Sequence, residues 1–173
     1  RVLASDLNAM QSFLNGKFNY DPGIYQGYDF NIPAKRFMGK LDYNLGNRNK
    51  LTLRYTQLDS STDSLMSGSS SLGNGNRMNS NSMSFSASNY VNMENIRSAV
   101  GLWNSVLGNS MANEFIVGYS HHDESRLLID KIFPVVDILG GDGSGYMSFG
   151  AEPFSLNNEV RYKTFQIQDN FTK

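Results

Sequence analysis

The sequence contains no cysteine, which excludes disulfide bonds and thiolate metal sites in all 173 residues. No stretch approaches the roughly 18 consecutive apolar residues of a membrane-spanning helix. Acidic and basic residues nearly balance, with a formal net charge of −1. The chain therefore lacks the basic surface of nucleic-acid-binding proteins, and we expect no nucleic-acid partner. A mean hydropathy of −0.41 does not exclude membrane β-strands, because their apolar residues alternate with polar ones.

Two neighbouring stretches, residues 37–45 and 51–56, alternate between apolar and polar side chains. Their apolar side chains occupy odd positions: Phe37, Leu41, Tyr43, Leu45, Leu51, Leu53 and Tyr55. A period of two predicts strands with one apolar face, and residues 46–50 supply a hairpin loop. Pairing Leu45 with Leu51 places Asp42 opposite Arg54, which predicts an ion pair on the polar face.

The rest of the chain alternates between tight turns and long polar segments. We expect a loop over 1–34 with a helix at 4–18, a hairpin at 35–58 and a Ser-rich loop at 59–83. A second hairpin at 84–121, a Gly-rich loop at 122–156 and a last strand at 157–173 follow. In the second hairpin, Phe115, Val117 and Tyr119 alternate with Glu114, Ile116 and Gly118, although the register of 84–107 is not fixed.

Such a strict segregation of connection lengths is typical of outer-membrane barrels, which have tight periplasmic turns and long extracellular loops. We therefore predict an all-β fold: a segment of about five strands from a large antiparallel transmembrane β-barrel, with a short helix in one loop. The odd-position residues of both hairpins would face lipid, and Asp42 and Arg54 would face the lumen. A soluble antiparallel sandwich with two functional loops remains the alternative.

Several short motifs together resemble the barrel of TonB-dependent outer-membrane receptors, in particular the Oar-like branch of Bacteroidetes-type bacteria, which carries a carboxypeptidase-regulatory-like domain. The hairpin with Phe37-Met38-Gly39-Lys40-Leu41-Asp42-Tyr43-Asn44-Leu45 carries the first part of the likeness. Met111-Ala112-Asn113-Glu114-Phe115-Ile116-Val117-Gly118-Tyr119, Glu152-Pro153-Phe154-Ser155 and Phe165-Gln166-Ile167-Gln168-Asp169-Asn170-Phe171-Thr172 follow in order.

The resemblance implies a bacterial outer-membrane barrel of about 22 strands that is closed inside by a plug. It also implies ligand uptake driven by an energy-transducing inner-membrane complex, with a surface lipoprotein as a further partner. Outer-membrane lipid and the rest of the barrel would surround this segment. The sequence contains neither a plug nor an energy-coupling box, so we expect it to be one piece of a longer polypeptide. The matched motifs are strand and turn motifs, and they leave the ligand-binding residues unknown.

No group of residues predicts an enzyme, and we expect no catalytic, cofactor or metal site. His121 and His122 would point to opposite faces of a strand, which disfavours a shared metal ion. The glycines at 140–145 lack the spaced oxygen ligands of a calcium loop and the Gly-Lys-Ser/Thr of a phosphate loop. Two other functions remain open beside uptake: a docking barrel of a surface assembly without transport, and a soluble adhesin or carbohydrate-binding sandwich.

Overall fold

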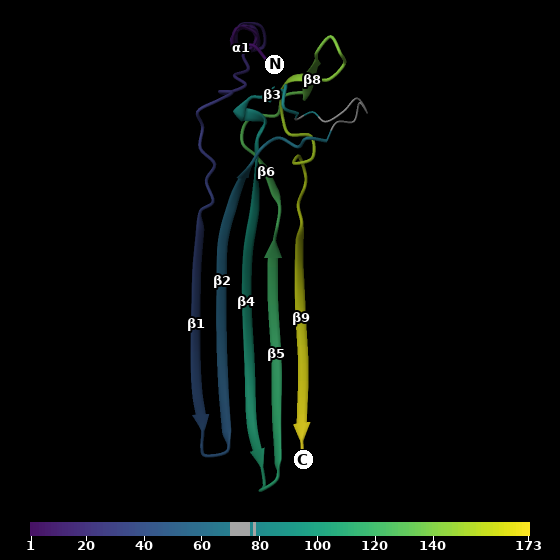
Figure 1. Cartoon of the computed structure of the whole chain (residues 1–173). Helices are drawn as coiled ribbons and strands as arrows, with labels where there is room; N and C mark the ends of the chain where they lie inside the picture. Colours follow the sequence, from purple (N-terminus) through teal and green to yellow (C-terminus); the bar gives the residue numbers. More distant parts are fainter. Residues whose placement is uncertain (70–76, 78) are drawn as a thin grey trace. The chain divides into compact units, whose positions relative to one another are not determined.

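The structure is a computed structural model that describes residues 1–69, 77 and 79–173 (Figure 1). Its described part is mostly antiparallel sheet with one α-helix. We expected one domain over residues 1–173, whereas the structure has two compact units, each built from three stretches of the chain. Unit 1 contains Arg1–Ile32, Thr62–Asn92 and Arg126–Asn158, and unit 2 contains Pro33–Ser61, Met93–Ser125 and Glu159–Lys173.

The five long strands of unit 2 have the order β1-β2-β4-β5-β9 (Figure 1). They belong to a six-stranded sheet, in which the short strand β6 (Arg126–Leu128) pairs with the start of β4. The strands are β1 (Ala34–Leu45), β2 (Asn49–Ser64), β4 (Tyr90–Leu107), β5 (Met111–Asp123) and β9 (Arg161–Thr172). The pairs β1–β2, β4–β5 and β5–β9 are antiparallel, and each register continues without a break. The alternating stretches of the sequence are therefore strands, as predicted. The sequence left the register of 84–107 open, and in the structure Trp103 lies opposite Phe115.

The predicted register of the first hairpin was wrong by two residues. Leu45 pairs with Asn49, so the loop contains three residues rather than five, and Asp42 lies opposite Thr52 instead of Arg54. The shorter loop forms because Gly46 adopts a φ of 70°, a backbone conformation that glycine takes without steric cost. A shift of two positions preserves which side chains share a face, so the predicted faces of both strands are unchanged.

The two tight turns of unit 2 use the same chemistry. The β4–β5 turn begins at Gly108, whose φ of 71° matches that of Gly46, and in both turns an asparagine follows the glycine. Asparagine suits such turns because its side chain can bond the backbone nearby. The Val106 N–H donates to the Arg48 carbonyl at 2.8 Å, which ties the two turns together.

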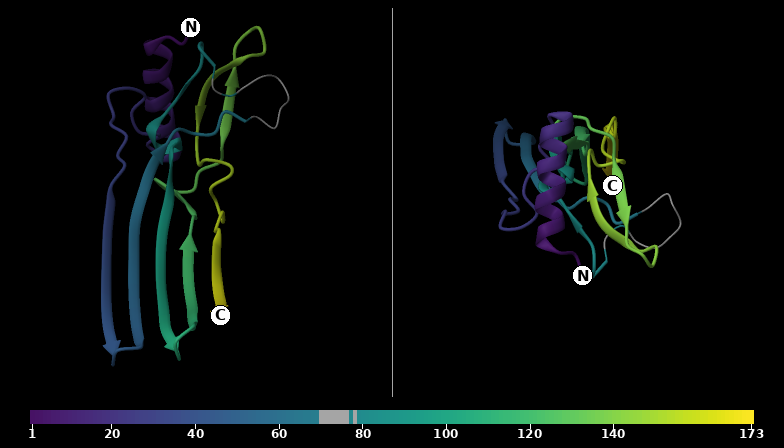
Figure 2. Two further views of the ribbon diagram at one scale, coloured as in Figure 1. Left: turned by 60° about the horizontal axis from the view of Figure 1, so that its bottom comes forward. Right: turned by 90° about the horizontal axis from the view of Figure 1, so that it is seen from above.

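Unit 1 has a helix and a small sheet (Figure 2). The helix α1 spans Ala4–Phe18, which confirms the predicted helix, although it begins without a side-chain cap and ends at Asn19 in the left-handed region. The sheet has the order β3-β8-β7. Its strands are β3 (Met83–Ser84), β7 (Val136–Leu139) and β8 (Gly145–Phe149), and the 3₁₀ helix η1 (Ser86–Ser88) and β6 (Arg126–Leu128) complete the unit.

The core of unit 1 collects apolar side chains from all three of its stretches. Its buried members are Leu7, Leu14, Tyr20, Phe85, Met147 and Phe149. Tyr20 stacks on Phe133 with ring centroids 3.9 Å apart, and Tyr25 meets Phe85 edge to face. These aromatic residues of the first segment therefore stabilise unit 1, which is the structural role that such clusters usually have.

Two segments predicted to be loops carry regular or buried structure. Residues 59–64 of the predicted loop 59–83 belong to β2, and Met66 and Arg77 are buried, while residues 70–76 and 78 lie outside the described residues. The predicted loop 122–156 contains β6, β7 and β8. The loop predictions therefore miss the end of β2 and the short strands, of which β8 contributes Met147 and Phe149 to the core of unit 1.

A buried ion pair joins two of these segments in unit 1. Arg77 donates from Nε to Asp137 Oδ1 at 2.6 Å and from Nη2 to Oδ2 at 3.0 Å, and its Nη1 donates to the carbonyls of Ser67 and Ser69. Ser148 donates its hydroxyl to the same carboxylate at 2.7 Å. Burial raises the pKa of Asp137, but the hydrogen bonds from Arg77 and Ser148 outweigh burial and hold this pKa below its usual range.

Candidate functional site

The most unusual feature of unit 2 is that one face of its sheet is mostly apolar on all five strands, with Asp169 of β9, which lies opposite Phe115, as the charged exception. Paired residues share a face, so the registers assign each side chain to one side within β1–β2 and within β4–β5–β9. The closeness of Gly101 to the Leu53 side chain places both groups of strands on the same side. We call this side the apolar face. Its members are Phe37, Leu41, Tyr43, Leu45, Leu51, Leu53, Tyr55, Ala99, Gly101, Trp103, Phe115, Val117, Tyr119, Phe165, Ile167 and Phe171.

The apolar face is ordered in rows that cross the strands. The central row is aliphatic: Leu41 pairs with Leu53, and Gly101 pairs with Val117, which pairs with Ile167. A methyl group added at Gly101 would lie 3.6 Å from Cδ2 of Leu53 and 3.3 Å from Cγ1 of Val117, so the two halves of the row are adjacent.

Aromatic rows lie on both sides of the aliphatic row. The row nearer the tight turns contains Tyr43, Trp103 and Phe115, and the row on the other side contains Tyr55, Tyr119 and Phe165. Trp103 donates from Nε1 to Asn49 Oδ1 at 3.3 Å, so its polar atom reaches the next row, which is polar. Amphipathic rings that bridge an apolar and a polar layer are typical of interfaces between two such media.

The side chains of the apolar face are exposed. Leu41 is 62%, Tyr43 59%, Phe165 65% and Ile167 61% exposed. The structure describes every residue of unit 2, and these residues form only the strands and their connections. An exposed apolar surface of this extent is rare on soluble monomers and indicates a binding or membrane surface.

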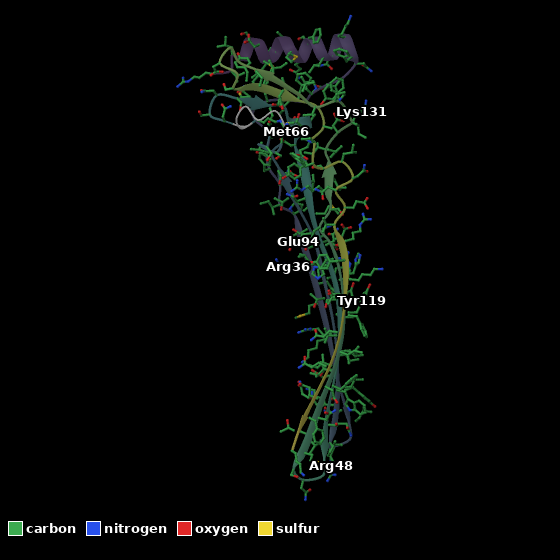
Figure 3. All side chains as sticks on the ribbon, turned by 90° about the vertical axis from the view of Figure 1, so that its right-hand side faces the viewer. Arg36, Arg48, Met66, Glu94, Tyr119 and Lys131 are labelled. Carbon is green, nitrogen blue, oxygen red and sulfur yellow. The ribbon has the colours of Figure 1, made fainter. Side chains whose placement is uncertain are left out.

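The opposite face of unit 2 is polar, with charged or amide side chains on every strand, including Glu94 and Asn104 of β4, and an apolar patch of Val100, Leu102 and Ile116 near its centre. Figure 3 shows Tyr119 on one side of the strands, and Arg36 and Glu94 on the other. We call this side the polar face.

Asp42 is the best-connected residue of the polar face. It accepts a hydrogen bond of 2.5 Å from the Thr52 hydroxyl and forms ion pairs with Lys40 at 3.0 Å and Lys50 at 3.4 Å. Its predicted partner Arg54 lies on the same face but is not opposite it, so the predicted pair is corrected to a cluster of Asp42 with Thr52, Lys40 and Lys50.

All ten residues that the sequence predicted to share one face do so. Sequence reasoning missed the contributions of β4 and β9, namely Ala99, Gly101, Trp103, Phe165, Ile167 and Phe171. In β4 the signal was hidden because Val100, Leu102 and Val106 make the polar face of this strand apolar as well. In β9 the alternation of Phe165 and Ile167 with Gln166 and Gln168 was readable from the sequence.

Polar side chains bound the apolar face at both ends. Toward the turns, Asn49, Ser105 and Asn113 lie in the row that ends with Leu45 and Phe171, and we call these three polar residues the neutral border. Away from the turns lie two rows with ionisable side chains, which we call the charged border. Its members are Lys35, Gln57, Asp59, Arg97, His121, Asp123, Arg161 and Lys163.

Ion pairs link neighbouring strands at the charged border. Arg97 of β4 donates to the carboxylate of Asp59 on β2 and, at 2.9 Å, to the carbonyl of Leu58. Arg161 of β9 donates from Nε to Asp123 of β5 at 3.0 Å and from Nη1 to Glu159 at 2.9 Å.

The remaining candidates from the sequence lie in separate places. His121 lies at the charged border between Arg97 and Lys163, whereas His122 stacks on Tyr162 on the polar face, which confirms that the two histidines point apart. The glycine-rich segment closes the β7–β8 turn, where Asp142 accepts hydrogen bonds from Ser144.

Within the part of the chain that the structure describes, no helix has the length and apolar character to cross a membrane. Comparison with protein-family models, with curated proteins and with solved structures found no match to this chain. The two faces of unit 2 are therefore the features from which we infer a function.

Proposed function

We propose that unit 2 is a membrane-spanning part of an outer-membrane β-barrel and that the chain belongs to a TonB-dependent receptor that takes up a ligand. The observation that carries this proposal is the apolar face, which exposes large side chains on all five strands while the other face is polar. Barrel strands in membranes have this alternation, with apolar residues toward lipid and polar residues toward the lumen.

The dimensions of the apolar face suit a bilayer. The rows of the neutral and charged borders that bound it are eight residues apart on β2, from Asn49 to Gln57, or about 26 Å along the strand. A tilt of about 40° reduces this length to a height of about 20 Å, close to the apolar band of about 25 Å on barrel proteins. Each strand is at least as long as the 9–11 residues that a tilted crossing needs, since the shortest has 12 residues.

The sheet edges suggest what surrounds unit 2. Among the described residues, no strand pairs with the outer edge of β1 or β9. Unpaired backbone groups are not tolerated in hydrocarbon, because no water is present to satisfy them. We therefore propose that further strands close the barrel at both edges, and that outer-membrane lipid covers the apolar face.

The polar face would then line the lumen and face the plug. Uptake with an energy-transducing inner-membrane complex, and a surface lipoprotein as partner, follow from the motifs that resemble the receptor family. A docking barrel without transport would use the same sheet. A soluble sandwich is less well supported, because its apolar face would lie beneath a second sheet, whereas Leu41 and Tyr43 are exposed.

Two measurements test the proposal. The first is extraction: the protein is expected in the outer-membrane fraction, to need detergent for solubility, and to migrate faster on a gel before boiling than after it. Release into buffer without detergent would overturn the membrane assignment. The second is uptake by cells with and without the inner-membrane energy-transducing complex. Uptake that persists without this complex would overturn the receptor assignment and leave the barrel intact.

A further inference from the structure

The two borders of the apolar face differ in charge. At equal distance from the central aliphatic row, the neutral border has the amides Asn49 and Asn113 and the hydroxyl of Ser105, with no ionisable group in its row. The nearest charge on the central side of this row is the acid Asp169, whose carboxylate accepts a hydrogen bond from Asn113 at 2.9 Å. The corresponding row of the charged border contains Arg97, His121 and Lys163. The two ends of the apolar face are therefore built for different surroundings.

Only some of the basic residues at the charged border form ion pairs within the protein. Arg97 pairs with Asp59, and Arg161 pairs with both Asp123 and Glu159. Lys35 and Lys163 form no ion pair within 4.0 Å with any residue that the structure describes, and both are exposed.

These cations are spread over the width of the face. Lys35 stands on β1, Arg97 on β4 and Lys163 on β9. Neighbouring strands are about 4.8 Å apart, so Lys35 and Lys163 lie about 19 Å from each other across the sheet. This spacing exceeds the size of one small anion and suits several separate anionic groups side by side.

We propose that the charged border binds the phosphate groups of membrane lipids whose acyl chains cover the apolar face. This inference depends on the proposed membrane position of unit 2. A lipid places its phosphate at the end of its hydrocarbon chains. Arg97 and Lys163 lie one row beyond Tyr119 and Phe165 of the apolar face, and Lys35 lies one row beyond Phe37. Lysine and arginine bind phosphate by charge-assisted hydrogen bonds, and each basic residue at an anionic membrane surface strengthens the attachment. The neutral border offers only amides and a hydroxyl, so it would not select anionic lipids.

The test compares two double variants with the same change in charge. In the border variant, Lys35→Gln and Lys163→Gln remove the two unpaired cations of the charged border. In the control variant, Lys40→Gln and Lys50→Gln remove two cations from the polar face of β1 and β2. The complete protein, purified in detergent, is reconstituted into nanodiscs made of phosphatidylglycerol and phosphatidylcholine in equal parts. Native mass spectrometry then counts the lipids of each kind that remain bound.

We expect the unaltered protein and the control variant to retain phosphatidylglycerol in preference to phosphatidylcholine, and the border variant to lose about 10- to 30-fold of this preference. Equal losses in both variants would overturn the inference, because net charge alone would then explain the binding. No preference in the unaltered protein would overturn it as well. Displacement by millimolar inorganic phosphate would show binding of free phosphate rather than of lipid, and would also contradict the inference.

The result separates this inference from the proposed function. If the protein needs detergent but shows no preference among lipids, only the lipid contact is wrong. If it is soluble without detergent, the membrane position itself is wrong.

Discussion

Replacing Leu53 with arginine tests the membrane position of the apolar face most directly. Leu53 lies in the central aliphatic row, four residues from Asn49 on one side and four from Gln57 on the other. Each of these polar residues is about 13 Å away along the strand, so a charge at position 53 would lie near the middle of the bilayer. At this depth an arginine costs about 2–4 kcal/mol, or about 30- to 700-fold in the folding equilibrium.

The same substitution has a different cost if the face is in contact with water. Leu53 is 47% exposed, and a substitution at an exposed position of a soluble protein usually changes the free energy of unfolding by no more than about 0.5 kcal/mol. The cost of Leu53→Arg therefore differs between lipid and water by an amount of free energy that denaturant unfolding in lipid vesicles measures easily. A cost below about 1 kcal/mol would refute the lipid-facing position of Leu53.

The matched control is Gln166→Arg, because Gln166 lies on the polar face of β9, directly beside Ile167 of the central row. A lumen-facing arginine should cost much less than one in hydrocarbon. Thr52 is a poorer control, although it neighbours Leu53, since it is buried and its hydroxyl bonds Asp42. Equal effects of Leu53→Arg and Gln166→Arg would contradict the assignment of the two faces.

Four further predictions concern unit 1. Asp137→Asn leaves Arg77 buried without its partner and should lower the free energy of unfolding by about 3–5 kcal/mol. Denaturant titrations measure this loss, and an unchanged free energy would mean that the pair does not form in solution. Burial raises the pKa of Asp137, but the hydrogen bonds outweigh burial and hold this pKa below its ordinary value of 3.8. The stability that this carboxylate contributes is therefore present above that pH and is lost as the pH falls through the folded pKa. Resistance to proteolysis should decrease over the same range, and Asp137→Asn should remove this pH dependence. Gly150→Ala should cost about 3 kcal/mol or more, since the added methyl group would lie 2.1 Å from a backbone oxygen at a φ of 97°, whereas Gly27→Ala, with the same left-handed backbone but open space, should cost about 1 kcal/mol; similar thermal shifts would contradict this. Tyr146→Phe removes two hydrogen bonds to the start of α1, of 2.6 and 3.1 Å, and should speed hydrogen exchange of the first helical turns but not of the second hairpin.

The sequence predicted the faces of the first hairpin better than its register. A period of two assigns Leu41 and Leu53 to one face, and every even shift leaves that assignment unchanged. The register depends on the loop, and the sequence alone does not show whether the chain reverses over three residues or five. The left-handed conformation of Gly46 selects the three-residue loop. The loop length in turn determines which residue lies opposite Asp42.

Unit 1 could not be predicted from local patterns. Its strands are as short as the two residues of Met83–Ser84, and its core joins Leu7, Phe85 and Met147 from segments more than 60 residues apart in sequence. Polar and Gly-rich segments predict loops when each is considered alone. The buried pair of Arg77 and Asp137 gave no signal either, because charged residues of such segments are usually exposed.

The division of unit 1 into three stretches has a consequence for the order of folding. Each tight hairpin of unit 2 brings together residues close in sequence, so its closure costs little chain entropy. The contacts of Leu7 with Phe85 and Met147 form only after a complete hairpin separates each stretch from the next, and such distant contacts form slowly. We therefore expect nascent chains to assemble their hairpins first, and unit 1 to be the last part to gain protection and the part most dependent on chaperones before its three stretches meet.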